Sequence, residues 1–187
     1  MILQRLHEYY GRSQDAGNGL PPPGWERKRI PYLIEISAAG RFFKLTSRRH
    51  GPRPTAITDS LVPKSVVRSG TKAYQQPNLL WDHLGFVLGH PKSDDPKDVE
   101  QARLQNEHFR RRIQELAKAL PGNHSAQAVV RFYESGEDVR VRDDPEWPDC
   151  ASITGCNVTF RLATEPDLVV LDPDIMHYVG KLESEPG

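Results

Sequence analysis

The segment from residue 64 to residue 78 combines side chains that hold phosphates with side chains that read base edges. Its members are three cations, a Ser-Gly pair and three amides: Lys64, Arg68, Lys72, Ser69, Gly70, Gln75, Gln76 and Asn78. Cations attract phosphates whatever the base sequence, glycine permits a close backbone approach, and amides both donate and accept hydrogen bonds. The segment is therefore suited to gripping a DNA duplex, and its amides suit A·T pairs, whose minor-groove edge presents only acceptors.

The charge around this segment is positive, although the whole chain has 25 basic and 25 acidic residues. Residues 41–89 contain two acids and eight cations, namely Arg41, Lys44, Arg48, Arg49, Arg53, Lys64, Arg68 and Lys72. Residues 134–149 contain seven acids and two cations, and residues 164–187 contain six acids and one cation. A basic front followed by acidic segments predicts an anionic partner for the front, with a solvated surface as the alternative.

Other chemistry has weaker support in the sequence. No phosphate-binding or dinucleotide glycine motif is present, and Cys150 and Cys156 lack the second pair that a zinc site needs. Asp172, Asp174 and His177 could gather a divalent ion, but acids that precede a helix more often cap it. We therefore expect a non-catalytic chain with neither metal nor cofactor.

Composition predicts one globular core in a cytoplasmic protein. The chain has 187 residues, 37% of them apolar, and no apolar run approaches the roughly 20 residues of a membrane span. Two cysteines fit a reduced compartment, and residues 1–6 lack a secretory pattern. A membrane is therefore not among the expected partners.

Hydrophobic periodicity predicts an α+β fold with a largely antiparallel sheet and several packed helices. A first amphipathic helix is expected at 2–12, a hairpin from strands 31–36 and 41–46, and a short strand at 60–62. Further helices are expected at 79–88 with Asn78 as cap, from 93–96 to about Leu120, and at 126–133 with Ser125 as cap. Strands at 153–162 and 168–171 and a helix from Asp172 to about Leu182 complete the prediction.

Several motifs of the chain resemble those of a known family. They are Met1-Ile2-Leu3-Gln4-Arg5-Leu6 with Tyr9-Tyr10, Pro22-Pro23-Gly24, Ile34-Glu35-Ile36 with Gly40-Arg41-Phe42, Leu61-Val62-Pro63, and Asn78-Leu79-Leu80-Trp81-Asp82 with Val87-Leu88-Gly89. In these motifs the chain resembles the large subunit of the type I-C CRISPR surveillance complex (Cascade), through most of its length and most strongly over residues 1–90.

The resemblance implies a function in antiviral defence. Such a subunit scans double-stranded DNA for a protospacer-adjacent motif (PAM), opens the duplex beside it, and lets the guide RNA pair with the target strand. Its expected partners are PAM-bearing DNA, the guide RNA, the other Cascade subunits and a separate helicase-nuclease. Because the family's subunit is several times longer, residues 1–187 are expected to be a single N-terminal PAM-recognition domain.

The resemblance also implies which residues form the DNA site. The family's run of a basic residue, Ser or Thr, Gly, a second basic residue and Asn corresponds here to Arg68, Ser69, Gly70, Lys72 and Asn78. The phosphate contacts are expected to be Arg48, Arg49, Arg53 and Lys64. Gln75, Gln76 and Asn78 remain alternative base-reading amides.

Two other functions compete with DNA recognition. In the first, the domain is an assembly surface whose acidic segments dock on basic neighbours, while its basic front binds guide RNA or an acidic phage anti-CRISPR inhibitor. In the second, Asp172, Asp174 and His177 form a metal-dependent nuclease centre.

Overall fold

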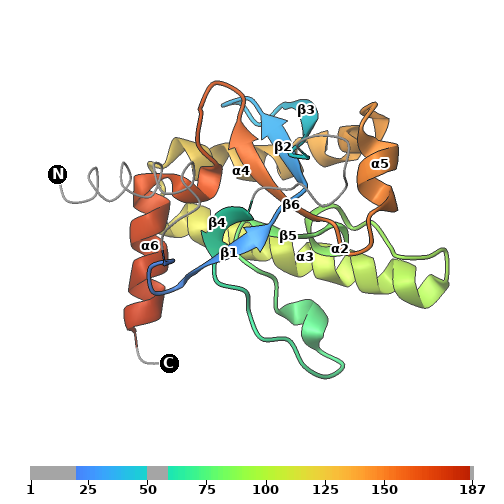
Figure 1. The fold of residues 1–187 in the computed structure, drawn as a ribbon, viewed down its shortest axis with the longest axis horizontal. Coiled ribbons are helices and arrows are strands. Elements are labelled where there is room, and N and C mark those ends of the chain that lie inside the picture. Colours follow the sequence, from blue (N-terminus) through green and yellow to red (C-terminus); the bar gives the residue numbers. More distant parts are fainter. Residues whose placement is uncertain (1–19, 50–58, 186–187) are drawn as a thin grey trace.

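The computed structural model describes residues 20–49 and 59–185 (Figure 1). The helix expected at 2–12 and the candidate cation Arg53 lie outside these residues. The described strands are β1 (Trp25–Arg29), β2 (Tyr32–Ile36), β3 (Phe42–Ser47), β4 (Asp59–Pro63), β5 (Trp81–His83) and β6 (Asn157–Leu162). The α-helices are α2 (Leu84–Leu88), α3 (Pro96–Ala119), α4 (His124–Glu134), α5 (Trp147–Ser152) and α6 (Pro173–Ser184), and the 3-10 turns are η1 (Ala73–Gln75), η2 (Glu137–Asp143) and η3 (Val169–Leu171).

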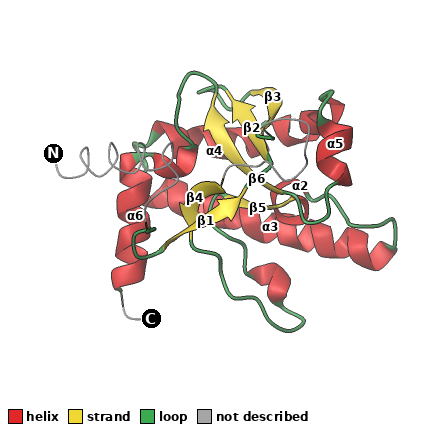
Figure 2. Cartoon of the chain, viewed as in Figure 1, coloured by secondary structure: helices red, strands yellow, loops and turns green. Residues whose placement is uncertain are grey.

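The strands form a four-stranded sheet and a separate two-stranded ribbon (Figure 2). The sheet has the order β3-β2-β6-β5, and its β2–β6 pair is parallel while its other two pairs are antiparallel. The ribbon pairs β1 with β4 in antiparallel register, with Trp25 opposite Pro63 and Arg29 opposite Asp59. The expected α+β fold with a largely antiparallel sheet is confirmed.

Strand β2 is the centre of the core, because all five of its residues are buried. Glu35, the one acid of the strand, is satisfied by the Thr46 hydroxyl, the Arg161 guanidinium and the Lys44 ammonium. Burial alone would raise the pKa of Glu35, but the hydrogen bonds from Thr46 and Arg161 outweigh it and lower the pKa below its usual range. A charge inside the sheet is tolerated because its neighbours on β3 and β6 pair with it.

Helices α3 and α4 form a layer behind the sheet in Figure 1. The Asp95 carboxylate accepts the Lys97 N–H at 2.8 Å, and Pro96 follows it in the first turn, so the expected start of α3 is confirmed. Phe109 and Ile113 of α3 are buried at helical spacing. From α4, Phe132 packs edge-to-face against Phe160 of the sheet at 5.5 Å between ring centroids.

Acidic side chains cover the edge of the sheet at β3. The Phe42 N–H donates to Glu137 at 2.9 Å, and the Leu45 N–H donates to Asp144 at 3.0 Å. Both acids come from η2 and the residue that follows it. Part of the acidic segment 134–149 therefore satisfies an edge strand from within the molecule, which blocks strand addition there.

The structure corrects the helix expected at 79–88. Leu80 has a left-handed backbone with φ 64°, which interrupts a helix, and Trp81–His83 pairs with β6 as strand β5. Helix α2 begins after that strand, and its cap is His83, whose Nδ1 accepts the Gly85 N–H at 3.2 Å. The Asn78 cap predicted from the sequence is therefore wrong.

Two smaller expectations also differ, and one strand was not expected. Helix α4 is capped by Asn123 rather than Ser125, because the Asn123 oxygen accepts the Ala126 N–H at 2.8 Å. Residues 169–171 form the 3-10 turn η3 rather than a strand, although Leu168 bridges to Arg161. Strand β1 was not anticipated. The hairpin, the strand at 60–62 and the terminal helix capped by Asp172 are confirmed.

None of the helices in the described part of the chain combines the length and apolar character needed to cross a membrane.

Candidate nucleic-acid interface

Residues 64–78 link β4 to β5 and are called the basic loop below. In Figure 1 this loop projects from the lower edge of the molecule, below the ribbon and α3. The Lys64 N–H donates to the Gly24 carbonyl at 2.8 Å, which fixes the start of the basic loop to the ribbon. Its far end leads directly into β5, so both ends rest on the folded core.

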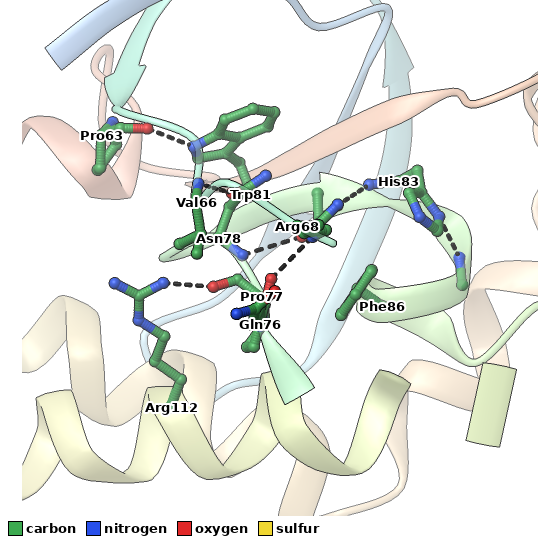
Figure 3. Close-up of polar contacts among 12 residues, drawn as sticks. Pro63, Val66, Arg68, Gln76, Pro77, Asn78, Trp81, His83, Phe86 and Arg112 are labelled. Carbon is green, nitrogen blue, oxygen red and sulfur yellow. Dashed lines mark hydrogen bonds and ion pairs between the residues drawn. The ribbon is translucent and has the colours of Figure 1, made fainter. Parts of the chain in front are cut away.

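Arg68 ties the middle of the basic loop to the core (Figure 3). Its guanidinium forms an ion pair with the buried Asp82 carboxylate and donates to the Gln76 carbonyl at 2.7 Å. The same group lies 4.1 Å from the centroid of the Phe86 ring. A guanidinium that is paired and stacked in this way positions the loop rather than reaching a partner.

Asn78, the last residue of the basic loop, is buried, with an exposed fraction of 3%. Its side-chain oxygen accepts the Val66 N–H at 2.8 Å, and its backbone N–H donates to Asp82 at 2.9 Å (Figure 3). The left-handed Leu80 turns the chain so that Asp82 faces back toward Asn78, and the Thr159 hydroxyl holds the Leu80 carbonyl at 2.8 Å. Asn78 therefore closes the base of the loop in this conformation.

Helix α3 and the ribbon provide further anchors. Arg112 of α3 donates to the Pro77 carbonyl (Figure 3), and the Tyr74 ring lies 5.5 Å from the His108 ring. Glu26 of β1 accepts both the backbone N–H and the hydroxyl of Ser65 at 3.0 Å. Consecutive arginines on a helix usually lie in solvent, so the sequence alone does not indicate this anchoring role of Arg112.

Seven residues of the basic loop, from its start to its tip, are exposed to solvent. Its exposed members are Lys64, Val67, Ser69, Gly70, Thr71, Lys72 and Gln75. Gly70 has φ +72°, and a Cβ built on it would meet nothing within 4 Å, so the backbone there is open to a partner. Of the three amides, Gln75 is exposed and its side-chain N–H donates to the Tyr74 hydroxyl at 3.3 Å, whereas the Gln76 side-chain oxygen is buried without a hydrogen-bond partner among the described residues.

The cations that precede the basic loop are less accessible than its tip. Arg48 is half-buried and donates to the Ser60 hydroxyl, and burial together with the charge of Arg161 lowers its pKa. Arg49 lies 5.8 Å from the centroid of the Tyr32 ring, and its buried Nε has no hydrogen-bond partner in the described part of the chain. Of the expected phosphate contacts among the described residues, Lys64 is exposed at the start of the basic loop, whereas Arg48 and Arg49 pack near the ribbon and β2.

Strand β1 adds cations that sequence reasoning missed. Arg27, Lys28 and Arg29 are consecutive, and strand pairing places them opposite Leu61, Ser60 and Asp59 of β4, which leads into the basic loop. Lys28 lies 5.9 Å from the centroid of the Trp81 ring, at the base of the same loop. The run Trp25-Glu26-Arg27-Lys28-Arg29 was visible in the sequence, but its pairing with β4 was not.

Asp172, one of the three candidate metal ligands, caps helix α6 instead. Asp172 accepts the Asp174 N–H at 3.0 Å and the amide of Asn123 at 2.7 Å, as the cap of α6. Within residues 20–49 and 59–185, no three His, Cys, Asp or Glu residues gather in a way that could hold a metal ion. Cys150 and Cys156 are buried free thiols with their sulfur atoms 3.8 Å apart.

The chain belongs to the family of CRISPR-associated proteins described as Cas_Csd1, whose model matches residues 6–186. It is therefore a CRISPR-associated protein related to the Cascade complex, and membership implies that it works with other components of such a complex. No curated protein matches the chain.

Proposed function

We propose that this chain is a non-catalytic PAM-recognition domain, at the N-terminus of the large subunit of a type I-C Cascade. In this role it binds duplex DNA, supports opening of the duplex for the guide RNA, and contributes to recruitment of a separate helicase-nuclease. The observation that carries the proposal is an exposed basic tip held on a rigid base. Binding sites are most precise where a structured core fixes the side chains that touch the partner.

The exposure of each residue of the basic loop decides which role we propose for it. Lys64 and Lys72 are exposed cations that can neutralise phosphates, and the open backbone at Gly70 permits close approach to the duplex. Gln75 is the exposed amide, so we assign base reading to it. Arg68 and Asn78 act as positioning residues, because the side chains of both make contacts within the fold.

Gln75 should control discrimination between DNA sequences. Replacing it with alanine removes the exposed amide, so we expect preference for a T-rich PAM duplex over a scrambled duplex to fall by about 1–3 kcal/mol. Fluorescence anisotropy with the two duplexes at two salt concentrations measures this preference. Gln114→Ala, an exposed amide on α3, is the matched control.

The outcomes separate the possible roles of the basic loop. An unchanged preference in Gln75→Ala would overturn the assignment of Gln75. Salt-sensitive binding without any preference in the wild-type chain would leave phosphate contacts and move base reading to the assembled complex. No binding even at low salt would overturn DNA recognition by this chain.

A second candidate function is an assembly surface for other Cascade subunits. Phe43 of β3 and Val139 of the neighbouring η2 have exposed fractions of 64% and 60%, and exposed large apolar side chains suit protein contacts. Reconstitution with partner subunits discriminates the two functions. Phe43→Ser should weaken assembly if this surface docks a subunit, whereas Lys72→Ala should weaken DNA capture and leave assembly intact.

A further inference from the structure

A cleft of about 550 Å³ opens next to His83, the last residue of β5, the strand that follows the basic loop. Its walls come from the start of α2, the first half of α3, and the turn after α5. Its lining includes His83, Gly85, His90, Gln101 and Gln105. The volume lies within the roughly 300–1,000 Å³ typical of small-molecule sites.

The cleft contains polar groups that the fold itself leaves unused. Gln101 and Gln105 lie four residues apart on α3 and are half-buried, yet neither side-chain amide makes a hydrogen bond with another described residue. The amide atoms of both side chains remain accessible to solvent, so water satisfies them until a ligand takes its place. Two such amides on one face of α3 give this side of the cleft both hydrogen-bond donors and acceptors.

Two imidazole rings contribute further groups. The His83 Nδ1 accepts the Gly85 N–H, so its Nε2 carries the proton and can donate. The His90 ring packs edge-on against Trp147, with 5.0 Å between centroids. Burial lowers the pKa of both histidines, which keeps the rings uncharged at neutral pH.

Glycine at position 85 is needed for this arrangement. A Cβ on Gly85 would overlap the amide oxygen of Gln105 and would also crowd the His83 ring. The absence of a side chain therefore lets the Gln105 amide lie against the start of α2. A side chain at this position would push that amide aside and fill part of the cleft.

The cleft is joined to the basic loop through one aromatic ring. Phe86 lies 4.1 Å from the Arg68 guanidinium and 5.1 Å from the His83 ring, measured to ring centroids (Figure 3). Arg68 anchors the basic loop and His83 lines the cleft. Phe86 is buried, so these contacts connect the anchor of the basic loop to the wall of the cleft through the core.

We propose that this cleft binds an unpaired nucleotide of the DNA strand that flanks the duplex held by the basic loop. The amides of Gln101 and Gln105 match the donors and acceptors of a base edge, and flat uncharged imidazoles suit contact with a base. Lys92 lies at the rim as a cation for phosphate, although it also contacts Asp98 at 3.7 Å. The inference rests on the proposed function, since it presupposes DNA at the loop.

The test compares two labelled probes with the 187-residue chain by fluorescence anisotropy. One probe is a blunt T-rich PAM duplex, and the other is the same duplex with a short unpaired extension at one end. We expect tighter binding of the extended probe, and we expect Gln105→Ala to reduce that advantage about tenfold, the worth of one good amide–base contact. Gly85→Ala should reduce it as well, while Gln114→Ala on the same helix should not.

Affinity for the blunt duplex is the internal reference, and thermal unfolding followed by circular dichroism checks that each variant is folded. Equal binding of both probes by the wild-type chain would overturn the cleft and leave duplex recognition standing. Binding of neither probe would instead mean that the proposed function fails. If Gln105→Ala keeps its preference for the extended probe but loses binding to a Cascade subunit, the cleft is a protein site and the inference is overturned.

Discussion

Asp82 is the residue on which the geometry of the basic loop depends. Its buried carboxylate pairs with Arg68 and accepts the backbone N–H groups of Asn78 and His83, each at 2.9 Å. One side chain thus fixes the middle of the loop, its end and the start of α2. A buried carboxylate with this many donors is stable because each donor compensates for lost hydration.

Replacing Asp82 should therefore be costly. In Asp82→Asn the ion pair with Arg68 is lost and a half-buried guanidinium is left without its counter-charge, so we expect about 2–4 kcal/mol less stability toward urea. Glu107→Gln breaks exposed pairs with Arg103 and Arg111 on α3 and is the matched control, which should change little. Equal effects of the two substitutions would contradict the role assigned to Asp82.

His83 should make stability depend on pH. Burial, opposed in part by Asp82, lowers its pKa, so the folded chain binds this proton less readily than the unfolded chain. The stability gained from a neutral His83 is therefore present above the ordinary histidine pKa of about 6.5 and is lost as the pH falls below it. His90 contributes with the same sign.

The measurement is urea unfolding between about pH 7 and pH 5, the range in which an ordinary histidine titrates. His83→Asn keeps a side-chain oxygen that can cap α2 but cannot titrate, so we expect it to flatten the pH dependence without abolishing it. A slope equal to that of the wild-type chain would show that His83 is not the titrating group.

Among the elements, edge strand β3 depends on acids that come from η2 and the residue after it. The sequence around residues 134–149 is acidic, and its composition favours a docking surface. In the structure Glu137 and Asp144 accept N–H groups of β3, and Asp138 pairs with Arg110 of α3 at 2.6 Å. These acids therefore hold elements together inside the molecule.

Asp144→Ala tests whether these acids protect the edge strand β3. It removes the acceptor of the Leu45 N–H at the edge of the sheet, so we expect a loss of about 1–3 kcal/mol and a greater tendency to associate through β3. Denaturant unfolding and light scattering measure the two effects. Asp143→Ala changes the exposed neighbouring acid and should leave both unchanged.

At the scale of the whole molecule, the basic loop and the ribbon lie on one side of the core, while α6 stands at the left end in Figure 1. Cations from β1 reach this side because β1 pairs with the strand that leads into the loop. The chain therefore has a formal net charge of zero and a local positive surface, and long-range attraction of phosphates depends on that local surface.

Lys72 should contribute to this attraction for every DNA sequence. Lys72→Ala removes one exposed cation, so we expect weaker binding to PAM and scrambled duplexes alike, with a salt slope shallower by about one. Lys181→Ala, an exposed cation on α6, is the control and should leave the slope unchanged. A change in sequence preference without a change in slope would contradict the phosphate role of Lys72.

Local sequence patterns predict those elements whose hydrogen bonds and caps are made between residues close together in the chain. The β2–β3 hairpin, α3 with its Asp95 cap and α6 with its Asp172 cap follow from alternation, helical spacing and capping chemistry, all of which act over a few residues. The basic character of residues 41–72 and the family resemblance were also present in the sequence.

Tertiary structure decided which candidate residues face outward. Arg68, Asn78 and Gln75 are equally polar in the sequence, yet Arg68 and Asn78 are held by Asp82 and Val66 while Gln75 is exposed. The left-handed Leu80 and the pairing of β5 with β6 create this difference. The sequence by itself determined the chemical groups available to the site, whereas contacts between distant segments determined which of them are exposed to a partner, because most polar groups that are buried find their hydrogen-bond partners within the fold.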